Sequence, residues 1–192
     1  GWHGAFTVKI LVTGATSGLG RNAVQYLLQS GESVVATGRN CEVGRSLTNA
    51  GAQFVALDLT EASEDDCARL MDGCDAVWHC AAKSSPWGDK TAFWLANVKV
   101  THTLAQAAGR LNIPRFIHIS TPAVYFDFQH HNDLPETYLA RAFSSHYASS
   151  KYAAEQVIAG AVSRYSATRF ILLRPRGLFG PHDQVIVPRL MQ

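Results

Sequence analysis

The sequence of 192 residues lacks several features that would assign it to other protein classes. It has no apolar run near the roughly 18 residues that a membrane-spanning helix needs, so we expect no membrane span. Its net charge is small, with 17 Lys and Arg against 15 Asp and Glu, which excludes a strongly basic surface for nucleic acid. Its first residues, GWHGAFT, do not have the charged-then-apolar layout of a secretory signal, and we expect a cytoplasmic protein.

Cysteine is also sparse, and its arrangement does not suit metal binding. None of the cysteines belongs to a Cys-x-x-Cys pair, and no spacing of cysteine and histidine matches a zinc site, so we predict no metal. The simplest interpretation is free thiols in a reducing compartment. The four cysteines are Cys41, Cys67, Cys74 and Cys80.

The sequence instead contains an alternation of short apolar runs and helical patterns. Apolar residues make up 47% of the chain, which is the composition of a globular domain. The runs have the continuous apolar character of strands that are covered on both faces. This alternation predicts an α/β fold, a Rossmann-like doubly wound parallel sheet flanked by helices. The predicted strands are 8–12, 33–37, 53–57, 76–80, 116–120 and 170–173.

Three helical segments lie between these runs. An apolar stripe from Leu19 to Leu28 predicts an amphipathic helix, and Gly31 is placed to close it. The segments 90–111 and 146–165 have the pattern of long helices. In the second segment one helical stripe consists of Tyr147, Lys151, Ala154, Ile158, Ala161 and Tyr165.

Polar residues and glycines follow each predicted strand, where a parallel sheet of this kind binds its ligand. Gly14, Gly18 and Gly20 come after the first strand and before a helix, together with Thr16, Ser17 and Leu19. Glycines at this place allow a tight turn and a close approach of the backbone to a pyrophosphate, and the helix N-terminus offers N–H groups. The segment predicts dinucleotide binding, and an ordinary structural turn is the alternative.

The end of the second predicted strand has no acidic residue. An Asp or Glu there would bind the adenosine ribose and repel a 2′-phosphate. Arg39 stands there instead and favours NADP, with NAD as the alternative cofactor. The other interpretation of Arg39 is an exposed loop charge. Asp58, after the third strand, either hydrogen-bonds the adenine or begins the next turn.

Tyr147 and Lys151 place a phenol and an ammonium four residues apart, on one face of a helix. A nearby ammonium favours the phenolate, so Tyr147 can exchange a proton with a carbonyl or an alcohol. A hydroxyl after the fifth strand, from Ser120 or Thr121, would hold the substrate oxygen. Capping of the strand end is the alternative for both hydroxyls.

These motifs together resemble the short-chain dehydrogenase/reductase superfamily. The order of the motifs is similar to that of its extended branch, which includes NAD-dependent epimerases and dehydratases and hydroxysteroid dehydrogenases. The stretches 81–101, 120–126 and 173–190 resemble the 3β-hydroxysteroid dehydrogenase-like group, which also contains bacterial reductases of β-keto acids and related lipids. The motifs are TGATSGLG (13–20), HCAA (79–82), NV (97–98), HIST (118–121), YASSK (147–151) and RPRGLFGP (174–181).

The resemblance implies catalytic roles for Tyr147, Lys151 and Thr121, with Ser120 in support. It also implies that Asn97 has a structural and proton-relay role. Together with the glycine turn, it predicts a larger set of cofactor-binding residues. These are Gly14, Thr16, Ser17, Gly18, Leu19, Gly20, Arg39, Asp58, Leu59, Ala81, Ala82, Lys83, Tyr147, Lys151, Arg174, Pro175 and Gly177.

The resulting hypothesis is an NAD(P)-dependent oxidoreductase that transfers a hydride between nicotinamide and a secondary alcohol or ketone. The expected small-molecule substrate is steroid-like or is a β-keto or β-hydroxy lipid. A nucleotide-sugar epimerase or dehydratase and a non-catalytic NAD(P)-binding sensor are the alternatives. In this superfamily two long helices often form a dimer interface, so a homodimer is one assembly that the resemblance allows. The extended branch completes a substrate lobe after the sixth strand. We therefore expect residues 1–192 to be a Rossmann domain whose substrate lobe, expected after residue 180, is mostly absent, and the chain to be a fragment.

Overall fold

The fold is built on a seven-stranded sheet of order β3-β2-β1-β4-β5-β6-β7. The computed structural model describes residues 7–80, 89–119, 137–175 and 184–186. Strands β1 to β6 are parallel, and β7 is antiparallel to β6. The strands are β1 (Lys9–Thr13), β2 (Ser33–Gly38), β3 (Gln53–Ala56), β4 (Ala76–His79), β5 (Arg115–Ile119), β6 (Arg169–Pro175) and β7 (Gln184–Ile186).

The order of the parallel strands is that of a doubly wound sheet, so the predicted fold class is confirmed. Each predicted strand is present, with ends that differ by one or a few residues. Strand β7 was not predicted. The order places the switch point between β1 and β4, where a dinucleotide binds in folds of this kind.

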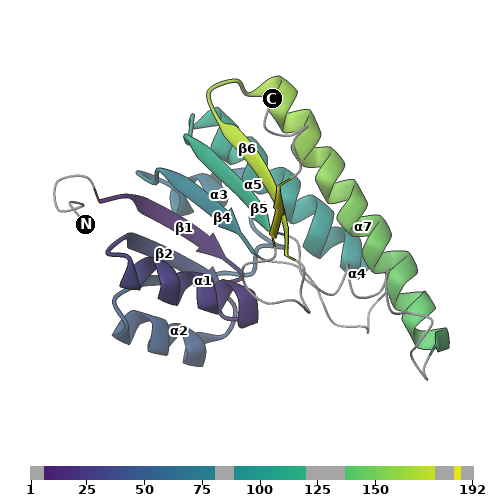
Figure 1. The fold of residues 1–192 in the computed structure, drawn as a ribbon, viewed down its shortest axis with the longest axis horizontal. Helices are drawn as coiled ribbons and strands as arrows, with labels where there is room; N and C mark the ends of the chain where they lie inside the picture. Colours follow the sequence, from purple (N-terminus) through teal and green to yellow (C-terminus); the bar gives the residue numbers. More distant parts are fainter. Residues whose placement is uncertain (1–6, 81–88, 120–136, 176–183, 187–192) are drawn as a thin grey trace.

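Helices cover both faces of the sheet (Figure 1). Helices α1 (Gly18–Gln29) and α2 (Cys41–Asn49) lie on one face, where Val24 and Leu47 belong to the same buried cluster as Val12 of β1. Helices α3 (Glu64–Leu70), α5 (Val100–Arg110) and α7 (Thr137–Arg164) lie on the other face, where Leu104 and Ile158 share a second cluster with Leu11. Adjacent residues of β1 thus serve opposite layers, as the pleat of a strand requires.

The helix predicted over 90–111 is interrupted by a π-helical turn. It consists of α4 (Lys90–Trp94), the π-turn η2 (Leu95–Lys99) and α5. Within this turn, the Thr101 hydroxyl donates to the carbonyl of Asn97 at 2.7 Å. A hydroxyl bonded to the carbonyl four residues earlier competes with the helix ladder, and π-turns are frequent at functional sites.

Helix α7 begins at Thr137, earlier than the predicted residue 146, and runs for 28 residues beside α5 (Figure 1). Its buried stripe follows the predicted positions, with Lys151, Ala154, Ile158 and Ala161 all enclosed. Helix α1 ends at the predicted glycine, because Gly31 has φ +83°.

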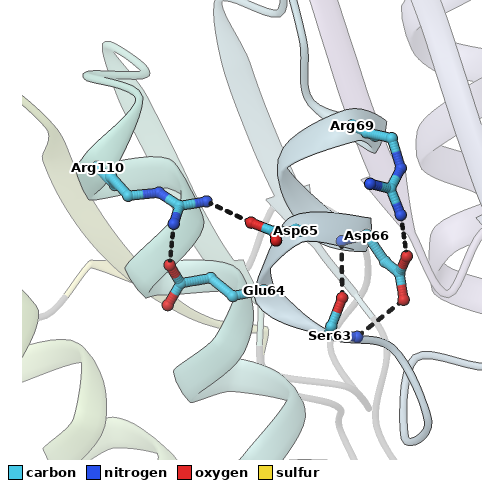
Figure 2. Close-up of polar contacts among 6 residues, drawn as sticks. All are labelled: Ser63, Glu64, Asp65, Asp66, Arg69 and Arg110. Atoms are coloured by element: carbon cyan, nitrogen blue, oxygen red, sulfur yellow. Dashed lines mark hydrogen bonds and ion pairs between the residues drawn. The ribbon is translucent and has the colours of Figure 1, made fainter.

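Helix α3 is anchored by its cap and by ion pairs to α5 (Figure 2). The Ser63 hydroxyl accepts from the Asp66 N–H at 3.0 Å, and the Asp66 carboxylate accepts from the Ser63 N–H at 2.9 Å, which forms a capping box. Arg110 of α5 pairs with Glu64 at 2.7 Å and with Asp65 at 3.3 Å. These exposed pairs contribute little energy each, but they link α3 to the end of α5.

The cysteines are free thiols, with Cys41 exposed and the other three buried. Within the described residues, no group of three or more His, Cys, Asp and Glu side chains is placed to hold a metal ion. No described helix is both long enough and apolar enough to cross a membrane.

Candidate functional site

The turn after β1 has a backbone shape that requires glycine at two positions. Gly14 has φ +64°, in the left-handed region that favours glycine. A Cβ atom on Gly20 would lie 2.0 Å from the Gly14 carbonyl oxygen, so the first turn of α1 approaches the end of β1 too closely for any side chain. The Ala15 N–H donates to the Thr37 carbonyl at 3.0 Å and fastens the turn to β2.

The N-terminus of α1 has no side-chain cap. The Ser17 side chain donates to the Gly14 carbonyl at 3.1 Å and does not bond to the helix N–H groups, and the first turn has no acidic residue. The first N–H groups of a helix have no partner within the helix, and the helix dipole makes this end positive. Gly18 is exposed, and a Cβ added to it would meet nothing within 4 Å. The turn therefore presents open, positively polarised backbone, which suits an anionic group such as a phosphate.

The residues after β2 and β3 lie beside this turn. Gly38 is packed against Thr16, whose Oγ1 would lie 2.7 Å from an added Cβ. Arg39 is exposed. The Asp58 carboxylate accepts from the Thr60 hydroxyl at 2.7 Å and from the Thr60 N–H at 3.0 Å. The hydroxyl bond is the main cause that lowers the pKa of Asp58, and Arg39 adds to it. Asp58 thus shapes a turn, which agrees with the second of its two interpretations.

A buried chain of hydrogen bonds runs from β1 to α7. The Thr13 hydroxyl contacts His79 Nδ1 at 2.7 Å, and His79 Nε2 contacts the Thr101 hydroxyl at 2.9 Å. Thr101 donates to the Asn97 carbonyl at 2.7 Å, and the Asn97 side chain donates to the Ser150 hydroxyl at 2.9 Å. Each of the five side chains is at most 1% exposed. The chain crosses the carboxyl edge of the sheet and connects β1, β4, α5, η2 and α7.

Lys151 follows Ser150 and is only 2% exposed. Burial lowers the pKa of its ammonium to about 8, against the opposing effects of Glu155 and Cys80. Glu155, one helical turn further on, is also buried and supplies the nearest opposite charge. A lysine so enclosed is unusual, because a buried charge needs polar partners. The backbone of Tyr147 lies one helical turn before Lys151 in α7, as predicted.

Two buried histidines lie side by side at this edge. His79 of β4 and His118 of β5 are register partners, with ring centroids 5.2 Å apart. Burial lowers the pKa of His79 to about 3 and that of His118 well below its ordinary value, and the Lys151 charge lowers both further. Both rings are therefore neutral. Among the residues that the structure describes, neither ring nitrogen of His118 has a hydrogen-bond partner.

The described residues bring together several of the predicted site positions. The glycine turn, Arg39 and Asp58 lie at the carboxyl ends of β1, β2 and β3, and Asn97 and Lys151 share the buried polar cluster. Two groups of predictions are not placed. Ala81, Ala82, Lys83, Ser120, Thr121 and Gly177 lie outside the described residues, and so do the side chains of Tyr147, Arg174 and Pro175.

Sequence reasoning missed much of the buried chain. Thr101 and Glu155 were not candidates, and Thr13, His79 and Ser150 appeared only inside quoted motifs. A usable signal was present for one pair: Thr13 and His79 end neighbouring strands and are register partners. The contacts from α5 and α7 depend on helix packing and leave no spacing signal in the sequence.

Comparison with known proteins gives consistent matches over most of the chain. The sequence model of the NAD dependent epimerase/dehydratase family matches residues 10–191. The uncharacterized protein YbjS of Escherichia coli K12 is 49% identical over 95% of this chain and 54% of its own length. A 2-alkyl-3-oxoalkanoate reductase of Shewanella oneidensis is 33% identical over 94% of this chain and 47% of its own length. A 3 beta-hydroxysteroid dehydrogenase/Delta 5-->4-isomerase of Mycobacterium tuberculosis is 30% identical over 96% of this chain.

The fold also matches solved structures. The UDP-glucuronic acid 4-epimerase of Bacillus cereus in complex with NAD aligns with a TM-score of 0.68 and 28% identity, over 87% of this chain and 56% of that one. The chain spans about half the length of the curated relatives that it matches, 54% and 47% for the first two. The predicted resemblance to the 3β-hydroxysteroid dehydrogenase-like group is supported only in part, because similarity to such an enzyme is one of several similarities.

We predict a pH-dependent stability that comes from Lys151. The pKa of this ammonium is about 8 in the folded chain and about 10.5 when unfolded. Between these values the unfolded chain holds the proton and the folded chain does not, so the Lys151 contribution to the free energy of unfolding rises with pH, by about 3 kcal/mol in total. Chemical denaturation between pH 7.5 and 10, compared with Lys151→Met, measures this contribution.

The comparison between variants is necessary because the buried thiols oppose this trend. Burial raises the pKa of Cys67 and Cys74 to about 11, so their contribution to stability falls at high pH in both proteins and cancels in the difference. If the free energy of unfolding changed with pH in the same way for the original chain and for Lys151→Met, the lowered pKa of the buried Lys151 ammonium would be contradicted.

Proposed function

The chain belongs to the NAD-dependent epimerase/dehydratase family, and on that premise we propose that it is the cofactor-binding and proton-transfer part of an NAD(P)-dependent oxidoreductase. The observation that carries this proposal is the burial of Lys151 at the carboxyl edge of the sheet, one helical turn after Tyr147 and close to His79 of β4 and His118 of β5. An ammonium held there is in place to act on a phenol and on a bound nucleotide.

The glycine turn fits the pyrophosphate of a dinucleotide. Gly14 and Gly20 are required by the protein's own backbone, whereas Gly18 leaves space that no protein atom fills. The uncapped start of α1 offers N–H groups to an anion. This division of roles between the glycines supports binding of a phosphate group at Gly18 through the backbone.

We assign NADP as the preferred cofactor and NAD as the alternative. Arg39 is exposed beside the turn, and the end of β2 has no carboxylate that would repel a 2′-phosphate. The Asp58 carboxylate accepts two hydrogen bonds from Thr60, and within the described residues it forms no ion pair with Arg39 that would compete with a 2′-phosphate. The relatives support the broader class, since the Bacillus cereus epimerase structure contains NAD.

The proposed chemistry assigns a proton to the protein and a hydride to the cofactor. Bound nicotinamide supplies or accepts the hydride. Tyr147 gives a proton to the substrate oxygen in reduction or takes it in oxidation, and Thr121, with Ser120, holds that oxygen. The Lys151 ammonium favours the phenolate of Tyr147, and Asn97 with Ser150 supports the turn of α7 that carries Lys151.

The substrate that we propose is a ketone or secondary alcohol on a β-keto or β-hydroxy lipid. The similarity to a 2-alkyl-3-oxoalkanoate reductase supports this class, and that to a 3 beta-hydroxysteroid dehydrogenase supports a steroid-like variant. A nucleotide-sugar epimerase is the second candidate, because the Bacillus cereus enzyme acts on UDP-glucuronic acid and shares the fold. The assignment of residues 1–192 to a Rossmann domain is part of this proposal.

Gly18→Ala is predicted to weaken binding of NADPH without loss of fold stability. The added methyl meets no protein atom, but it occupies the surface that we assign to the pyrophosphate. We expect the Kd to rise about tenfold or more, which corresponds to about 1.4 kcal/mol. Fluorescence titration of the chain with NADPH measures the Kd, and thermal unfolding measures stability.

Gly160→Ala is the matched control, because Gly160 is also exposed and also has nothing within 4 Å, but lies in α7 far along the chain from the turn. This variant should bind NADPH unchanged. Equal affinity of Gly18→Ala and the original chain would count against the assigned phosphate site. The same titration with NADH tests Arg39, and a clear preference for NADH would overturn the NADP assignment.

Tyr147→Phe is predicted to lower turnover by about 100-fold or more, because the proton donor is lost, while the Kd for NADPH stays within about twofold. The assay uses the full-length protein with NADPH and a 2-alkyl-3-oxoalkanoate, and a parallel assay with UDP-glucuronic acid tests the second candidate. Tyr152→Phe is the control, since Tyr152 is on the same helix and 64% exposed. Undiminished turnover by Tyr147→Phe would exclude the proposed mechanism.

A further inference from the structure

The buried chain of hydrogen bonds around His79 has a direction that its contacts determine. The Asn97 carbonyl can only accept a hydrogen bond, so the Thr101 hydroxyl donates its proton in the bond between the two groups. In its contact with His79 Nε2 at 2.9 Å, Thr101 is therefore the acceptor, and Nε2 must carry the hydrogen. The protonation site of this ring follows from heavy-atom geometry alone.

The other side of the ring agrees with this assignment. The Thr13 hydroxyl accepts from the Cys80 N–H at 3.1 Å and lies 2.7 Å from His79 Nδ1, so it can donate its own proton to that nitrogen. A neutral ring with its proton on Nε2 has Nδ1 free to accept that hydrogen bond. Donors and acceptors thus alternate correctly from the Cys80 amide, through Thr13, His79 and Thr101, to the Asn97 carbonyl.

The surroundings keep the ring neutral. His79 is fully buried, and the titratable groups that face it are His118 of β5 and Lys151 of α7, while Glu155 and Cys80 act on Lys151. A second proton on His79 would point an N–H group at the Thr13 hydroxyl and place a charge near the Lys151 ammonium. The chain of bonds thus requires a proton on Nε2, and burial near the Lys151 ammonium disfavours a second proton on Nδ1.

We propose that His79, held as the neutral tautomer with its proton on Nε2, is a positioning residue that couples the end of β1 to the π-turn and thereby to the turn of α7 that carries Lys151. Thr13 immediately precedes the glycine turn, and the Asn97 side chain holds Ser150, the neighbour of Lys151. His79 therefore connects the two regions that the proposed function assigns to cofactor binding and to proton transfer. The effect on turnover rests on that proposed function, whereas the tautomer does not.

The direct test is ¹⁵N NMR of the 192-residue chain labelled at histidine, with His79→Phe and His118→Phe used to assign the two buried rings. We expect His79 to show the signature of a neutral ring protonated at Nε2 and to keep it from pH 8 to pH 5. His118 has no hydrogen-bond partner within the described part of the chain, so it provides the comparison for a ring whose tautomer no described bond determines. A His79 ring protonated at Nδ1, or on both nitrogens at pH 7, would overturn the proposal.

Variants of Thr101 test the coupling. Thr101→Val removes the acceptor for His79 Nε2–H, and we expect the tautomer ratio to move about fivefold toward Nδ1, the factor for one net hydrogen bond. The amide signals of Asn97, Ser150 and Lys151 should move with it, and Thr101→Ser should restore both readouts. Thr103→Val is the matched control, because Thr103 donates to the Lys99 carbonyl at 2.9 Å in the same helix but is not part of the chain.

The results separate this proposal from the proposed function. Equal changes in Thr101→Val and Thr103→Val, or no restoration by Thr101→Ser, would show that the hydroxyl only stabilises α5 and would refute the coupling. Binding of NADPH is measured on the same samples. If the original chain does not bind NADPH while His79 has the expected tautomer, the proposed function is refuted and the positioning role is still supported.

Discussion

The burial of the Lys151 ammonium is the constraint that organises the carboxyl edge of this sheet. Further along α7, Ile158 and Ala161 pack in an apolar layer, so the helix is held to the sheet by ordinary hydrophobic contact. At Lys151 the same face must accommodate a charge, which is costly without polar neighbours. Most of the buried polar residues of the described chain are at this edge, and Glu155 supplies the opposite charge. A local transition from apolar to polar packing thus marks the site.

The glycine turn and the buried chain of hydrogen bonds share one strand. Thr13 is the last residue of β1 and the first member of the buried chain of bonds, and Gly14 begins the turn directly after it. A displacement at either place therefore affects the other through a short covalent connection. The row of Thr13, His79 and His118 across β1, β4 and β5 is rigid because it lies in a paired parallel sheet. The fold thereby holds the glycine turn and helix α7 in one defined relation, and the proposed catalysis requires such positioning.

Local patterns were sufficient to predict the strands, the glycine turn and the buried face of α7, because each depends on residues close together in the chain. Strand β7 was missed because its three residues are too few for a periodic signal and their pairing depends on where the chain returns. The π-turn was missed because LANVK is compatible with an ordinary helix, and the Thr101 bond to Asn97 becomes visible only in three dimensions. Lys151 was predictable from its spacing to Tyr147, whereas His79 and Ser150 required knowledge of how five elements pack together.

The most direct measurement is the change in backbone amide signals when NADPH is added to the ¹⁵N-labelled chain. The account predicts that signals of the turn after β1 and of the Asn97 and Lys151 turns move together and saturate with a single Kd, while those at the opposite edge of the sheet, such as Gly73 and Ile113, stay in place. Saturable changes confined to the opposite edge, or no change at millimolar NADPH, would contradict the claim that this edge of the sheet is a nicotinamide dinucleotide site.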